Sequence, residues 1–104
     1  MSDVEVDPET VATRLDEFDV VDVRDPADYA ERHVPDAENV PLDDVEDAVT
    51  GREWGDRVAV ICYAGRSSVP AAKLLDAHTD ADAVSVAGGY EAWDGPVVES
   101  VPAE

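Results

Sequence analysis

The feature of this sequence that most restricts its fold is an unbroken apolar run, Val58-Ala59-Val60-Ile61, which ends at the chain's single cysteine, Cys62. Because no polar residue alternates with the apolar ones, both faces of this strand are expected to be buried, as in a parallel sheet. A tight loop, residues 63–68, and a helical pattern from Val69 to Ala77 follow it. In open parallel sheets, functional sites lie outside the carboxyl ends of the strands, which is where this order places Cys62.

Strand and helix patterns alternate along the rest of the chain. They predict an α/β fold, with an open, mostly parallel sheet and helices on both of its faces. We expect residues 1–96 to form one domain and residues 97–104 to form a C-terminal tail. The predicted strands are Asp19–Arg24, a very short one near Ala37–Asn39, Val58–Ile61 and Ala83–Val86. The predicted helices are Pro8–Asp16, Pro26–Arg32, a weak one over Leu42–Val49, Val69–Ala77 and Tyr90–Trp93.

The composition is that of one small cytoplasmic domain. Of the 104 residues, 44% are hydrophobic, and no stretch approaches the roughly 18 apolar residues of a membrane span. The N-terminal segment is acidic and lacks the apolar region of a signal peptide. One cysteine forms neither an internal disulfide nor a zinc site built from a cysteine cluster, which favours a reducing cytoplasm. We therefore expect no membrane partner.

The charge balance is strongly acidic, with 26 acidic residues against 7 basic ones and a net charge of −19. A polyanion such as nucleic acid would be repelled, so it is an unlikely partner. The regularly spaced apolar segments argue against the disorder that such acidity often accompanies. The acidic residues are spread along the chain, which is typical of cytoplasmic proteins of salt-loving archaea. At molar salt the Debye length falls to roughly 3 Å, so repulsion between surface carboxylates is largely screened.

The loop after Cys62 favours a reactive thiol. A helix N-terminus presents unpaired N–H groups and a partial positive charge, which lower the pKa of a nearby thiol and bind anions. Gly65 permits a left-handed turn, Arg66 is suited to oxyanions, and Ser67 and Ser68 are good N-cap residues. A lone cysteine at the end of a buried strand is otherwise an inert hydrophobe, and that interpretation is the alternative.

Four segments, in order, resemble the rhodanese family of sulfurtransferases, and together they cover nearly the whole chain. The resemblance implies a single-domain sulfurtransferase with a parallel sheet of about five strands. The matching segments are Asp22-Val23-Arg24, Asp28-Tyr29 with His33 through Pro41, the active-site loop Cys62 through Ser68, and Ala87 through Trp93.

Two departures from the family pattern affect the loop and a surface turn. Many members have arginine five positions after the cysteine, where this chain has Ser67, so Arg66 is only a candidate substitute. Arg32 and Asp36 stand where the family usually has glycine, and we expect the surface turn to tolerate both. The related dual-specificity phosphatases and arsenate reductases have arginine six positions after the cysteine, where this chain has Ser68. The resemblance therefore favours sulfur transfer over phosphate chemistry.

The resemblance implies a two-step reaction through a persulfide on Cys62. The thiolate takes the outer sulfur of a small anionic donor such as thiosulfate, and an acceptor then removes it: cyanide in an assay, a thiol or a sulfur-carrier protein in the cell. The expected donors to the anion are mainly the backbone N–H groups of the loop, and no metal or organic cofactor is needed. These binding residues are Tyr63, Ala64, Gly65, Arg66, Ser67 and Ser68. The alternative is a catalytically silent or redox-sensing module that docks a partner protein.

Residues outside the loop are given structural roles. We expect Asp22 and Arg24 to form an ion pair or hydrogen-bond network at a strand end, and His33 to be a structural histidine. Trp93 and Tyr90 are interpreted as core or rim packing, with Trp93 also a candidate wall of the pocket. We expect Gly88 and Gly89 to be turn residues with no chemical role. We expect His78 to lie near a helix C-terminus, where it interacts favourably with the helix dipole.

Overall fold

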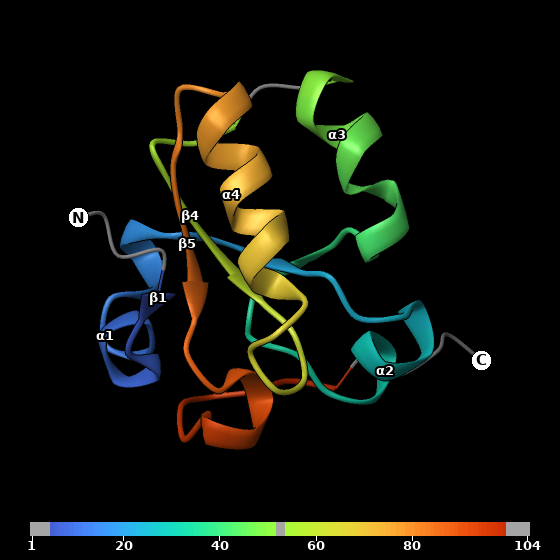
Figure 1. Ribbon diagram of the computed structural model, residues 1–104. Helices are drawn as coiled ribbons and strands as arrows, with labels where there is room; N and C mark the ends of the chain where they lie inside the picture. The colour runs from blue at the N-terminus through green and yellow to red at the C-terminus, as the bar shows by residue number, and fades with distance from the viewer. Residues whose placement is uncertain (1–4, 52–53, 100–104) are drawn as a thin grey trace.

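The computed structural model describes residues 5–51 and 54–99, and these form a five-stranded, wholly parallel sheet with the strand order β1-β5-β4-β2-β3 (Figure 1). The central strand β4 pairs with β5 on one side and β2 on the other, which places the cysteine-bearing strand in the middle of the sheet. The α/β fold expected from the sequence is confirmed. The strands are β1 (Glu5–Val6), β2 (Asp19–Asp22), β3 (Glu38–Asn39), β4 (Arg57–Ile61) and β5 (Asp82–Val86).

Helices cover both faces of the sheet. Helices α3 and α4 pack together on one face, as Figure 1 shows, while α1 and η3 pack on the opposite face, with Tyr29 of α2 against the same core. The α-helices are α1 (Pro8–Ala12), α2 (Pro26–Glu31), α3 (Val45–Gly51) and α4 (Ser68–His78), and the 3₁₀-helices are η1 (Leu15–Glu17), η2 (Leu42–Asp44) and η3 (Gly89–Ala92).

Strand β4 is buried on both of its faces. Val58 and Val60 face the core under α3 and α4, whereas Ala59 and Ile61 face the core under α1, and all four side chains are fully buried. This is the period-two alternation of a strand between two helical layers. It explains why the sequence of β4 is apolar throughout.

The first predicted helix, Pro8–Asp16, is too long. Helix α1 ends at Ala12, and the chain turns before the separate 3₁₀-helix η1. The N–H of Thr13 still makes a helical bond to the Glu9 carbonyl at 3.0 Å, but the N–H of Arg14 donates to the Val11 carbonyl at 3.0 Å, three residues back instead of four. The α-helical ladder therefore ends at this point.

Two strands differ from their predicted bounds. Strand β2 ends at Asp22 rather than Arg24, because the Arg24 N–H donates to the Asp22 carboxylate at 2.9 Å and so leaves the ladder. Strand β1 was not predicted. It has only two residues, and it is held by pairing with β5, where Glu5 faces Ser85 and Val6 faces Val86.

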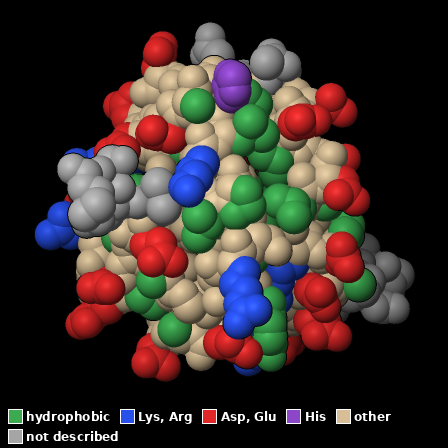
Figure 2. All heavy atoms as spheres, viewed as in Figure 1, with side chains coloured by type: hydrophobic (Ala, Val, Ile, Leu, Met, Phe, Trp, Pro, Cys, Tyr) green, Lys and Arg blue, Asp and Glu red, His purple; other side chains and the backbone are tan. Residues whose placement is uncertain are grey.

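The C-terminal residues that the structure describes lie against the domain. Val98 forms an antiparallel bridge with His33, with N–H to carbonyl distances of 2.8 and 2.9 Å. None of the helices within the described residues combines the length and hydrophobicity that a membrane span requires. Acidic side chains are distributed over the visible face of the molecule rather than gathered in one patch (Figure 2).

Candidate active site

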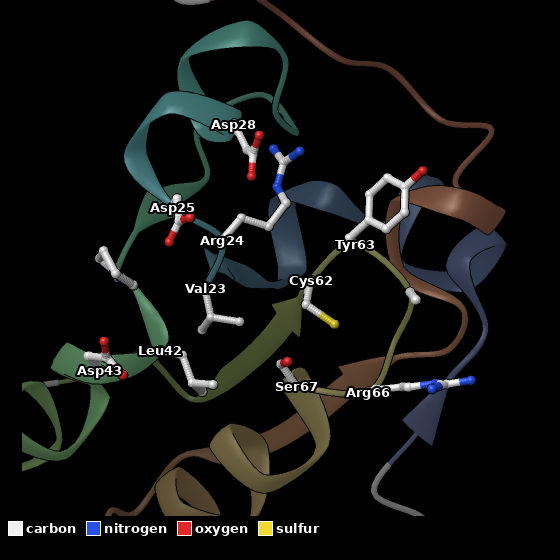
Figure 3. A pocket seen from close by; sticks show the side chains of 12 residues that line it. Val23, Arg24, Asp25, Asp28, Leu42, Asp43, Cys62, Tyr63, Arg66 and Ser67 are labelled. Carbon is white, nitrogen blue, oxygen red and sulfur yellow. The ribbon is translucent and has the colours of Figure 1, made fainter.

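Cys62 lies directly after β4, at the carboxyl end of the sheet, where the loop 63–67 leads into α4. Its side chain is almost wholly buried, at 5% exposure. Figure 3 shows the sulfur on the concave side of this loop, above Ser67. The buried strand and the helix start together fix the position of the thiol.

Three hydrogen-bonding groups surround the Cys62 sulfur. The N–H of Gly65 donates to it at 3.1 Å, and the N–H of Ser68 donates at 3.4 Å. The Ser68 hydroxyl oxygen lies 3.2 Å from the same sulfur. Gly65 has φ +83°, a left-handed conformation that glycine adopts without steric cost. The turn at Gly65 thereby aims its N–H at the sulfur.

These bonds lower the pKa of the Cys62 thiol. Burial is the largest influence and by itself raises the pKa, because it disfavours the charged thiolate. The Ser68 hydroxyl, followed by the backbone N–H groups of Ser68, Gly65 and Ser67, outweighs burial, so the pKa lies below the usual value of a cysteine. The thiolate is the nucleophilic form of cysteine, and the site is built to favour it.

A second serine lies behind the first. The hydroxyl oxygen of Ser85, on β5, is 2.7 Å from that of Ser68, and both side chains are fully buried. Cys62, Ser68 and Ser85 therefore form a continuous hydrogen-bonded chain from the sulfur into the core. Ser85 is not among the site residues that the sequence predicts. Its one signal was a polar residue in a strand that the apolar pattern assigns to the core.

The sulfur opens onto a pocket of about 470 Å³ at the sheet edge. Three aspartates, Asp25, Asp28 and Asp43, stand on its wall (Figure 3), and the exposed side chains of Leu42 and Tyr63 flank its mouth. The site therefore combines a thiolate and N–H donors in its floor with carboxylates at its rim. The lining residues are Val23, Arg24, Asp25, Asp28, Pro41, Leu42, Asp43, Cys62, Tyr63, Ala64, Arg66 and Ser67.

The six predicted loop residues do not all face the sulfur in the same way. Gly65 and Ser68 donate to it, whereas Tyr63, Ala64, Arg66 and Ser67 line the pocket. Arg66 is exposed, and Figure 3 shows its side chain directed away from Cys62. In this conformation the guanidinium does not take the place of the loop arginine that many rhodaneses carry.

The Asp22–Arg24 ion pair expected from the sequence is present at the end of β2. Asp22 is fully buried, and its carboxylate accepts from the Arg24 guanidinium at 2.8 Å and from the Tyr90 hydroxyl at 3.0 Å. The guanidinium also lies 3.9 Å from the centre of the Tyr90 ring. Burial, and next the Asp22 carboxylate, raise the pKa of Tyr90, so its hydroxyl remains a donor. The network ties the end of β2 to η3.

Helix η3 is also bonded directly to the cysteine loop. The N–H of Tyr90 donates to the Cys62 carbonyl at 2.9 Å, and that of Glu91 donates to the Tyr63 carbonyl at 3.0 Å. Gly88 and Gly89 have positive φ angles, as turn glycines do. Gly89 has a second role that the sequence did not reveal, since a Cβ there would lie 2.1 Å from the Cys62 carbonyl oxygen.

The remaining singled-out side chains lie away from the sulfur. His33 is buried, and its ring stacks on Tyr29 at 3.8 Å, with Nδ1 2.8 Å from the Tyr29 carbonyl. Neither His33 nor Trp93 lines the Cys62 pocket. Trp93 packs in the core on the α1 face and donates to the Pro96 carbonyl at 3.0 Å. Trp93 is thus not a pocket wall, while His33 occupies a structural position.

Comparisons with known proteins agree with this geometry. Residues 7–95 match the family model of the rhodanese-like domain. The chain is 34% identical over 89 residues to the thiosulfate sulfurtransferase GlpE of Pseudoalteromonas translucida, covering 84% of this chain and 85% of that protein. A rhodanese-related protein from Thermoplasma volcanium has a TM-score of 0.82 at 25% identity, covering 90% of this chain and 96% of its own. A structure of a rhodanese with anions from E. coli has a TM-score of 0.62 at 34% identity, covering 79% of this chain and 98% of its own. The chain therefore belongs to the rhodanese family, and it is a sulfurtransferase of the rhodanese type.

Proposed function

We propose that the protein moves sulfane sulfur from thiosulfate, or another persulfide donor, to a nucleophilic acceptor through a persulfide on Cys62. The observation that carries this proposal is the buried sulfur with its three hydrogen-bonding groups, which favour a thiolate. In the first step the thiolate attacks the outer sulfur of thiosulfate. A new S–S bond forms, the S–S bond of the donor breaks, and sulfite leaves with the electron pair.

The second step returns the enzyme to its starting state. An acceptor attacks the outer sulfur of the persulfide, the S–S bond breaks, and its electron pair stays on Cys62 as a thiolate. Cyanide becomes thiocyanate, a thiol becomes a persulfide, and a sulfur-carrier protein would accept the sulfur in the same way. The N–H groups of loop residues 63–68 are the donors proposed for the anionic sulfur. The reaction as proposed uses no metal or organic cofactor.

The acidic surface suggests the conditions in which this reaction runs. Thiosulfate is a dianion, and the carboxylates of Asp25, Asp28 and Asp43 at the rim repel it at low salt. Molar salt shortens the Debye length to about 3 Å and weakens this repulsion. We propose a salt-rich, reducing cytoplasm as the setting, which fits the net charge of −19 and the single free cysteine.

The test is the intact mass of the protein after incubation with thiosulfate. We expect a gain of one sulfur atom, which cyanide removes as thiocyanate. Cys62→Ser is the matched control, because it changes one atom of a side chain and should abolish the gain without unfolding the protein. If the wild-type thiol can be alkylated but gains no sulfur, the transfer proposal fails. The docking or redox-sensing module then becomes the better account, since Arg66 is directed away from the sulfur.

A further inference from the structure

We propose that Ser85 is a positioning residue for sulfur transfer, which orients the hydroxyl of Ser68 so that its proton points at the Cys62 sulfur. This inference rests on the proposed function, since it assigns Ser85 a part in the same reaction. Ser85 does not touch the sulfur itself. It lies one hydrogen bond behind Ser68, on a different element of the fold.

The geometry supports a directed chain of hydrogen bonds. Ser85 and Ser68 are both fully buried, so bulk water does not compete for their hydroxyl groups. Their oxygens are 2.7 Å apart, and the Ser68 oxygen is 3.2 Å from the Cys62 sulfur. β5 pairs directly with β4, and Val60 on β4 is the register partner of Ser85. The sheet therefore holds Ser85 in place relative to the cysteine strand.

The number of available protons decides the direction of the hydrogen bonds that link Cys62, Ser68 and Ser85. A serine hydroxyl has one proton to donate, and a thiolate only accepts. Ser68 can give its proton to Cys62 or to Ser85, but not to both. When Cys62 is a thiolate, Ser68 donates to the sulfur, and Ser85 must then donate to the Ser68 oxygen. In this orientation each hydroxyl proton has an acceptor, and each bond strengthens the next.

This orientation matters most when negative charge appears on the Cys62 sulfur. In the second step the S–S bond of the persulfide breaks, and its electron pair moves onto this sulfur. A Ser68 proton already aimed there stabilises the leaving thiolate without any rearrangement. The same arrangement stabilises the thiolate of the free enzyme. Ser85 should therefore influence both the acidity of Cys62 and the release of sulfur to the acceptor.

Charged side chains line the pocket beside Cys62, and the buried carboxylate of Asp22, at the end of the neighbouring strand β2, is paired with Arg24 and Tyr90. Arg24, Asp25, Asp28, Asp43 and Arg66 line the pocket, from the end of β2, from α2, from η2 and from the loop. The first turn of α4 carries no acidic residue. Changing Ser85 leaves all these groups in place, so a change in the acidity of Cys62 reports the hydroxyl chain.

The experiment measures the rate of iodoacetamide alkylation against pH, which reports Cys62 alone because the chain has one cysteine. Ser85→Ala should raise the midpoint by roughly 0.3–0.5 pH unit, which lowers the rate about two- to threefold below the midpoint. Ser68→Ala should raise it further, by about one unit. The double variant should match Ser68→Ala, since Ser85 acts only through Ser68. In sulfur transfer, Ser85→Ala should lower turnover with cyanide, because release of sulfur from Cys62 is slowed.

Three variants separate this role from simple packing. Ser85→Thr keeps the hydroxyl and should retain the wild-type midpoint, whereas Ser85→Val, of nearly the same shape, should show the shift. This pair carries the test if Ser85→Ala does not fold. Val84→Ala removes packing from the neighbouring position, which belongs to the core on the opposite face, and should leave the midpoint unchanged.

A midpoint that falls in Ser85→Ala would overturn the proposal, because it would mean that Ser85 draws the Ser68 proton away from the sulfur. An unchanged midpoint, or equal midpoints for the Thr and Val variants, would overturn it as well. Alkylation needs no sulfur donor. A failure of thiosulfate to load the wild-type protein is therefore distinguishable from a failure of the serine chain.

Discussion

Replacement of Gly89 by alanine should disrupt the active-site loop, because the new Cβ on η3 would overlap the loop backbone. Gly89 has φ +56°, and a Cβ there would lie 2.1 Å from the Cys62 carbonyl oxygen and 2.8 Å from the Gly65 nitrogen. These are backbone atoms, so no side-chain rotation relieves the overlap. The loop and η3 must separate, and the N–H bonds from Tyr90 and Glu91 to the loop carbonyls are then lost.

The expected loss of stability follows from these contacts. A left-handed alanine costs about 1–2 kcal/mol, and two hydrogen bonds contribute about 1 kcal/mol each. Alanine also restricts the unfolded chain, which returns about 0.4–1 kcal/mol. The free energy of unfolding should therefore fall by about 3 kcal/mol, out of the roughly 5–15 kcal/mol typical of a domain. Because the Gly65 N–H is displaced, the rate of persulfide formation should fall by about tenfold or more.

Urea denaturation followed by tryptophan fluorescence measures the free energy of unfolding. Loading with thiosulfate under folded conditions measures the rate of persulfide formation. Gly88→Ala is the matched control, since Gly88 also has a positive φ of 75°. Its Cβ would meet the Ala92 side chain at 2.6 Å instead of the loop backbone. We expect this control to lose some stability but to keep the reactivity of Cys62. Equal stability and equal reactivity for the two variants would refute the bracing role of Gly89.

Five further measurements test other parts of the argument. The alkylation rate of Cys62 should rise with pH through a midpoint below the value of about 8.5 for a free thiol, because the folded-state pKa is lowered. A lowered folded-state pKa contributes stability above the unfolded pKa and loses it as pH falls through the folded one, so wild type should gain stability over Cys62→Ser as pH rises. Arg66→Ala should raise the KM for thiosulfate by no more than about tenfold, or ~1.4 kcal/mol, and leave the alkylation midpoint in place, because its side chain points away from the sulfur. Asp36→Gly should raise the free energy of unfolding by about 0.5 kcal/mol, since Asp36 has φ +66°, whereas Asp36→Ala should lower it. Molar KCl should raise both the thermal midpoint and the rate with thiosulfate, and flat profiles would count against the halophilic interpretation.

The strand–loop–helix unit around Cys62 was predictable because its determinants are local. The apolar run of β4 is continuous since the strand is buried on both faces, and Pro70 lies in the first turn of α4. The surface turn at Asp36 tolerates a departure from the family's usual glycine. Asp36 takes the left-handed conformation that glycine usually supplies, and Asp is among the residues that tolerate it.

The parts that the sequence did not reveal depend on contacts between distant segments. Strand β1 has two residues and no pattern of its own, and its existence depends on β5, about 80 residues later by its register. Ser85 and Gly89 likewise acquire their roles only when β5 and η3 are laid beside the cysteine loop. A serine inside the otherwise apolar run Ala83–Val86 is the one local clue. Burial of such a hydroxyl demands a partner, and that partner is Ser68.

The way this site stabilises its thiolate suits a strongly acidic protein. An exposed arginine stabilises an anion through its charge, and mobile ions screen that interaction. At molar salt the Debye length, over which such screening acts, is about 3 Å. The Cys62 sulfur instead accepts from N–H groups at 3.1 and 3.4 Å and lies 3.2 Å from a buried hydroxyl. Buried interactions are screened much less, because salt ions do not enter the space between the partners. The acidity of Cys62 should therefore change little between low and molar salt, even where binding of the donor and stability of the fold change together. The backbone N–H groups and the two serines can then stabilise the Cys62 thiolate without the loop arginine that many family members carry. Arg66 would act only on the incoming donor.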